Sequence, residues 1–154
     1  MTDKIEKIIK EAFDNSENID NTVTEFTTYI AEQYSEMGTD AARILIDDFF
    51  YVLEKHYKKQ RDIIACFSNR MAIKILQVDN EKVLEIYLKY SDDIRKWAGK
   101  NSLVYASAMY LQGVFSRYYN KDYEHAMSCL QKSFEIRLKK LGRKDMLTNY
   151  ALKE

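Results

Sequence analysis

"LQGVFSRYYNKDYEHAMSCLQKSFEI", residues 111–136, carries two apolar patterns of helical period on either side of a polar corner, "NKD". The first pattern belongs to a helix that we predict over about 103–119. After the corner, apolar side chains recur at the three- and four-residue spacing of one helix face: Tyr123, Ala126, Met127, Leu130 and Phe134. A connection this short forces the two helices to run antiparallel, as a hairpin.

The composition extends this helical pattern to the whole chain. Proline is absent and only four glycines occur, which leaves long helices uninterrupted and gives strands almost no turn chemistry. Gly38, Gly99 and Gly142 each follow an apolar run of helical period, where a glycine commonly ends a helix. We therefore predict an all-α chain of about seven helices, folded as a single domain over residues 1–154. Its expected parts are a leading helix at 3–13, hairpins at about 20–58, 61–98 and 103–141, and a partial C-terminal helix.

An internal repeat supports this division. An offset of 43 residues superposes Asp79 on Asp122 and Gly99 on Gly142, the acid that opens and the glycine that closes a predicted helix. One hairpin buries only one face, so stacked copies must complete one another's core, and such arrays need about three units. The sequence predicts stacked antiparallel hairpins.

The same corner resembles the tetratricopeptide repeat. Gly113 stands at that family's small position in helix A, while Asp122, Tyr123 and Ala126 match the corner and the first position of helix B. Leu130 and Ser133 match its later bulky and small positions, although the segment from Gly113 to Asp122 is about one residue longer than the family pattern. The resemblance implies a right-handed α-solenoid with a concave groove that binds peptides. The long, degenerate repeats are similar in style to those of peptide-sensing regulators of Gram-positive bacteria and their phages.

The resemblance also implies which residues would line the groove. Asparagine and arginine side chains would hold the partner's backbone or carboxylate, while tyrosine rings would stack on its side chains. The residues at these positions are Asn69, Arg70 and Ile73 in one A helix, and Tyr110, Gln112, Arg117 and Tyr118 in the next.

Twelve tyrosines are present, and several of them gather between residues 105 and 123. A helix cannot bury side chains on every face, so some of these rings would face a groove or a partner, where a rigid apolar ring with one polar tip is well suited. The other interpretation is that they fill the core between repeats, and the sequence leaves both open.

Charge and cysteine usage limit the classes of partner. Lys plus Arg and Asp plus Glu are equal at 24 each, which argues against nucleic acid and anionic membranes. The basic clusters at 55–61 and 137–144 lie near predicted helix C-termini, where cations complement the helix dipole; a nucleic-acid site would need both on one face. No apolar run suits a signal peptide or a membrane span, and Cys66 and Cys129 lack paired or metal-binding spacing. We expect a cytoplasmic protein.

Catalytic patterns are weak. His56 and His125 have no metal-ligand spacing, and adjacent acids such as Asp47 and Asp48 point about 100° apart on a helix. We expect a non-enzymatic module that binds a peptide or protein surface as an adaptor, regulator or small inhibitor, without metal or cofactor. Homodimerisation through an end hairpin would use the same features. The alternative is a small all-α enzyme or ligand sensor with a site inside the bundle, using His56 or an acid such as Asp47.

Overall fold

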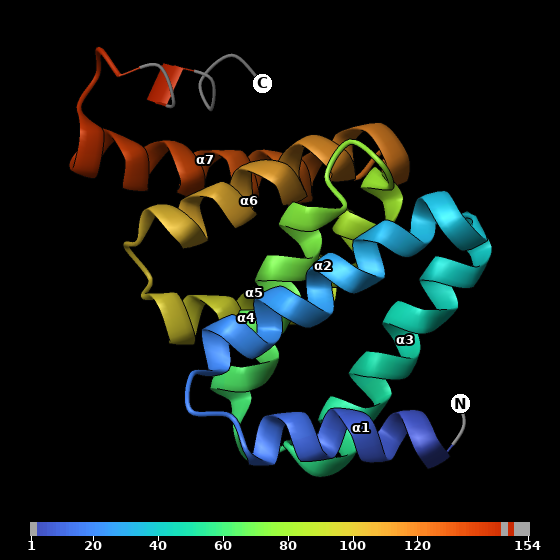
Figure 1. The fold of residues 1–154 in the computed structure, drawn as a ribbon. Coiled ribbons are helices and arrows are strands. Elements are labelled where there is room, and N and C mark those ends of the chain that lie inside the picture. The colour runs from blue at the N-terminus through green and yellow to red at the C-terminus, as the bar shows by residue number, and fades with distance from the viewer. Residues whose placement is uncertain (1–2, 146–147, 150–154) are drawn as a thin grey trace. The chain divides into compact units, whose positions relative to one another are not determined.

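The computed structural model describes residues 3–145 and 148–149, and within them the chain forms helices and no strand (Figure 1). The prediction of an all-α chain is confirmed. The predicted C-terminal helix falls largely outside the described residues. The elements are α1 (Asp3–Asp14), α2 (Ile19–Met37), α3 (Thr39–His56), α4 (Arg61–Lys74), α5 (Asn80–Ala98), α6 (Leu103–Phe115), the π-helical turn η1 (Ser116–Asn120) and α7 (Tyr123–Leu141).

The chain divides into two compact units, Met1–Asp79 and Asn80–Glu154, and each is described by itself. The boundary falls inside the predicted hairpin at 61–98, so α4 belongs to the first unit and α5 to the second. The single domain and the stacked solenoid stay predictions.

Most helix ends lie where local sequence signals place them. Gly38, Gly99 and Gly142 have φ of +87°, +104° and +83°, a backbone conformation that glycine adopts without a Cβ clash, and all three follow helices as predicted. A short side-chain oxygen at Asn101 or Ser102 is predicted to cap α6, and in the structure the Ser102 oxygen accepts a hydrogen bond from the backbone N–H of Tyr105 at 3.1 Å.

The start of α2 differs from the prediction. The spacing of Thr22 and Glu25 favours a capping box at Thr22. In the structure Asn18 is the cap instead, accepting from the backbone N–H of Asn21 at 3.2 Å. Asparagine is a stronger cap than threonine, so the helix extends by one more turn and Thr22 lies inside it.

The first unit is held by a row of aromatic rings that crosses four helices. Ring centroids of Phe13 and Phe26 are 5.6 Å apart, those of Phe26 and Phe49 are 5.2 Å apart, and those of Phe49 and Phe67 are 5.8 Å apart. Each contact joins a different pair among α1, α2, α3 and α4. Such rings bury large apolar areas and gain further from offset or edge contacts, so this row is the centre of the unit's core.

A buried carboxylate connects separate segments of the same unit through hydrogen bonds. Asp79 follows α4 and accepts hydrogen bonds from Arg43 of α3 and from the Tyr34 hydroxyl of α2. Burial is the main cause that raises the pKa of Tyr34 above its ordinary value, and the hydrogen bond to Asp79 raises this pKa further. Asp79 and its repeat counterpart Asp122 therefore stand at equivalent sequence positions but have different partners.

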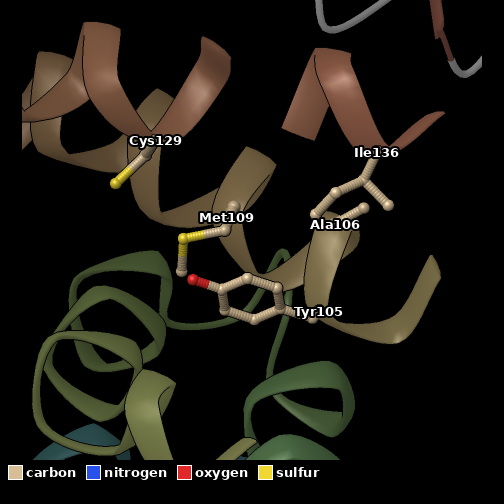
Figure 2. Close-up of a cluster of buried hydrophobic side chains, with 5 residues drawn as sticks. All are labelled: Tyr105, Ala106, Met109, Cys129 and Ile136. Carbon is tan, nitrogen blue, oxygen red and sulfur yellow. The ribbon is translucent and has the colours of Figure 1, made fainter. Parts of the chain in front are cut away.

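The second unit contains α5, α6 and α7, with α6 packed against both neighbours and most extensively against α7. Side chains of α6 and α7 form its buried cluster, in which Ile136 points toward Ala106 and Tyr105 lies beside Met109 (Figure 2). The Ser133 hydroxyl donates to the Ala106 carbonyl at 2.8 Å, so a buried polar group of α7 is satisfied by the backbone of α6.

Candidate partner-binding surface

The corner between α6 and α7 contains a π-helical turn. After Phe115 the backbone continues as η1 through Asn120, and Lys121 then takes a left-handed conformation with φ of +53°. The backbone N–H groups of Lys121 and Asp122 both donate to the Ser116 carbonyl, the latter at 3.3 Å. A π turn spans one more residue than an α turn, which accounts for the extra residue in this segment.

The two helices approach closely just before the corner. A Cβ added at Gly113 would lie 2.8 Å from Leu130 Cγ and 3.0 Å from the Ala126 carbonyl oxygen. Asp122 caps α7 by accepting from the backbone N–H of His125 at 3.1 Å. The corner is therefore fixed on both sides, by close helix packing and by a capped helix start.

Four large side chains on this corner are exposed, between 45% and 67% of their maximum, and we call them the tyrosine corner: Tyr118, Tyr119, Tyr123 and Met127. The Tyr119 ring contacts that of Phe115 at 6.1 Å, and the Arg117 guanidinium lies 5.9 Å from the Tyr118 ring. The turn thus presents apolar area on an anchored backbone.

Sequence reasoning found only part of this surface. It selected Tyr118, but it placed Tyr123 and Met127 on the packed stripe of α7. The buried residues of α7 are instead Ala126, Cys129, Leu130, Ser133, Ile136 and Arg137. The helix is rotated by about one residue from the expected face, so that its small residues meet α6. The small Ala126 opposite Gly113 is the signal that could have shown this rotation.

The four α6 and η1 residues selected from the sequence divide into two pairs. Arg117 and Tyr118 are exposed on η1. Gln112 is only 4% exposed, and its amide donates to the His125 ring at 2.8 Å. The Tyr110 ring lies 4.9 Å from the Arg137 guanidinium of α7. Gln112 and Tyr110 therefore serve the packing of α6 on α7, and contact of these residues with a partner stays a prediction.

The three residues selected from the sequence in α4 lie in the first unit, and they differ in exposure and in contacts. Asn69 is buried, whereas Ile73 is exposed. Arg70 pairs with Asp20 at 2.5 Å and so connects α4 with α2. Because α4 and α6 belong to different units, a groove shared by both sets stays a prediction.

The residues of the enzyme alternative have other surroundings. His56 Nε2 lies 2.7 Å from a Glu6 carboxylate oxygen that also accepts from Lys55 at 2.7 Å. The hydrogen bond from Lys55 is the largest cause that holds the pKa of Glu6 below its ordinary value, and the hydrogen bond with His56 is the next. Both bonds join the end of α3 to α1. Asp47 lies on an exposed face of α3.

The basic cluster at 55–61 is partly engaged in ion pairs, since Arg61 also bonds Glu54 at 2.9 Å. Cys129 is buried beside His125, and this burial raises the pKa of its thiol to about 11. Near neutral pH, Cys129 is a thiol and not a thiolate nucleophile.

Within residues 3–145 and 148–149, no group of three or more His, Cys, Asp or Glu side chains is arranged to hold a metal ion. Across the same residues, no helix combines the length and apolar character needed to cross a membrane.

Comparison with known proteins found no matching family model, no similar curated protein and no similar solved structure. The likeness to the tetratricopeptide repeat thus rests on the residues around the corner.

Proposed function

We propose that the chain is a non-enzymatic protein–protein interaction module whose partner contact centres on the tyrosine corner. The observation that supports this most is the exposure of Tyr118, Tyr119, Tyr123 and Met127 on one anchored turn. Tyrosine, methionine and arginine are enriched at protein interfaces, and tyrosine supplies large contact area at a small cost in side-chain entropy. Arg117 beside Tyr118 adds a cation that can hold a carboxylate or carbonyl of the partner.

The backbone at this corner suits recognition as well. π-Helical turns occur frequently at functional sites, because they redirect side chains that an α-helix would place elsewhere. The close approach at Gly113 and the cap at Asp122 reduce the freedom of the turn before binding, which lowers the ordering cost of association.

The finer fold that we propose is a right-handed stack of hairpins of the tetratricopeptide type. The seven α-helices that the described residues form are compatible with a helical-hairpin repeat protein. The partner is a peptide or a surface of another protein, and the module acts as an adaptor, a regulator or a small inhibitor by occupying that surface.

The test uses a display library of random peptides with the wild-type chain as bait. We expect the enriched peptides to bind the triple variant Tyr118→Ser, Tyr119→Ser, Tyr123→Ser at least about tenfold more weakly, since truncation of central aromatic contacts costs this much or more. Tyr51→Ser, at an exposed tyrosine of the first unit, is the matched control and keeps full affinity. Equal binding to wild type and the triple variant would overturn the proposal.

The same variant decides whether the partner is a second copy of the chain. Sedimentation over a range of concentrations would show a dimer that the triple variant no longer forms. A wild-type chain that stays monomeric at high concentration would count against homodimerisation and leave a different polypeptide as the partner.

A further inference from the structure

The first unit contains an open, mostly apolar pocket of about 390 Å³ between α1, α2 and α3. In Figure 1, α2 and α3 diverge from the corner that joins them and α1 crosses near their other ends, and the residues that line the pocket come from these three helices. Its walls include Ile5 and Ile8 of α1, Phe26 and Tyr29 of α2, and Leu45 of α3. This volume lies in the usual range of small-molecule sites, which are apolar with a few placed polar groups.

The pocket has a fixed floor and an accessible mouth. Ile9 and Phe49 at the floor are buried, and Phe49 is held between the rings of Phe26 and Phe67. At the mouth, Ile8 and Tyr29 are 50% and 53% exposed. The Phe49 ring at the floor is therefore held by its neighbours, while apolar side chains at the mouth stay accessible.

One charged side chain, Glu25, belongs to the lining, one helical turn before Tyr29. Among the described residues Glu25 has no ion-pair partner. Glu6, which follows the lining residue Ile5 in α1, is already bound to Lys55 and His56. A ligand that fills the apolar walls therefore meets an uncompensated negative charge at the rim, which favours a cationic group on the ligand.

We propose that this pocket binds a small amphipathic amine. The apolar body packs against Ile5, Ile8, Phe26 and Leu45, and the ammonium group pairs with Glu25 beside the Tyr29 ring, whose face attracts a cation. The site lies in the first unit and uses no residue of the tyrosine corner, so this proposal can be tested independently of the proposed partner binding.

The test compares three probes with the same eight-carbon body: octylammonium, 1-octanol and octanoate, each measured by calorimetric titration at neutral pH. We expect all three to show apolar binding, with octylammonium about fivefold tighter than octanol, because an exposed ion pair contributes up to about 1 kcal/mol. Octanoate binds most weakly, since its carboxylate is repelled by Glu25. Methyl shifts of Ile5, Ile8 and Leu45 in NMR spectra would locate the probes.

Two surface variants separate the charge from the pocket. Glu25→Gln removes the preference for octylammonium and leaves octanol affinity unchanged. Glu32→Gln changes an exposed acid on the same helix outside the lining, and it keeps the preference. The proposal is overturned if no probe binds, if octylammonium binds no tighter than octanoate, or if Glu25→Gln retains the preference.

Discussion

The carboxylate of Asp79 accepts two hydrogen bonds from the guanidinium of Arg43, at 2.6 and 2.7 Å. A third comes from the Tyr34 hydroxyl at 2.8 Å, and only 2% of the Asp79 side chain is exposed. Since Arg43 belongs to α3, Tyr34 to α2 and Asp79 to the segment after α4, one carboxylate joins two helices of the first unit to the segment that follows a third.

We predict that Asp79→Ala lowers the free energy of unfolding by about 2 kcal/mol, because the buried Tyr34 hydroxyl loses its acceptor and the partly exposed Arg43 guanidinium loses two hydrogen bonds. The repeat counterpart provides the control: Asp122→Ala removes only a helix cap and costs about 1 kcal/mol. Urea denaturation followed by circular dichroism measures both. Equal losses at the two positions would show that Asp79 acts as an ordinary cap.

The second prediction concerns the close crossing of α6 and α7. Gly113→Ala improves the intrinsic helix propensity of α6 by about 1 kcal/mol. Its Cβ would nevertheless be placed 2.8 Å from Leu130 and 3.0 Å from a backbone carbonyl. We therefore expect a net loss of about 1 kcal/mol or more, since overpacking costs about 1–3 kcal/mol.

A double-mutant cycle with Leu130→Ala tests this cause. The smaller side chain relieves one of the two contacts, so the penalty of Gly113→Ala should be lower in that background. An additive pair of losses, or a stabilised Gly113→Ala protein, would contradict the close packing.

The parts of the fold that could be predicted from sequence are those with local causes. Gly38, Gly99 and Gly142 end helices through their own backbone freedom, and Ser102 caps α6 through its own oxygen. The cap at Asn18 was missed although it is local as well, because Thr22 offered a second plausible start within the same turn. Local signals show that a helix begins in this segment, and the relative strength of the two candidate caps decides at which residue it begins.

The candidate sites depend on packing that local signals do not describe. The rotation that exposes Met127 follows from Ala126 meeting Gly113 across two helices. Gln112 was expected at a surface, but α6 is apolar on nearly every face, so its periodicity did not show which side meets α7. The pocket at Glu25 depends on the angle between α2 and α3, which no periodic pattern encodes.

The third prediction is a loss of stability at alkaline pH. Burial raises the pKa of Cys66 and Cys129 to about 11, from an ordinary value near 9. Burial also raises the pKa of Tyr57 and Tyr87. In each case the unfolded chain loses its proton first, so the stabilisation is complete below the unfolded pKa and is lost as pH rises toward the folded value.

For each cysteine the loss between about pH 9 and 11 amounts to about 2 kcal/mol. Urea midpoints at steps of pH from 8 to 11 measure the decline. Cys129→Ala removes one contributor, so the curve of this variant should fall less steeply than that of the wild type. A stability that stays constant to pH 11 would contradict the burial of these groups.

The fourth prediction separates packing from partner contact at Tyr110. Its ring lies 4.9 Å from the guanidinium of Arg137, which is buried in α7 and whose pKa is lowered by that burial. The positive charge is therefore partly desolvated, and the ring face compensates it. Tyr110→Phe keeps the ring and should change the free energy of unfolding by less than about 0.5 kcal/mol, whereas Tyr110→Leu should cost about 1–2 kcal/mol. If Tyr110→Leu instead weakened the binding of selected peptides while stability stayed the same, Tyr110 would belong to the partner surface, as the sequence predicted.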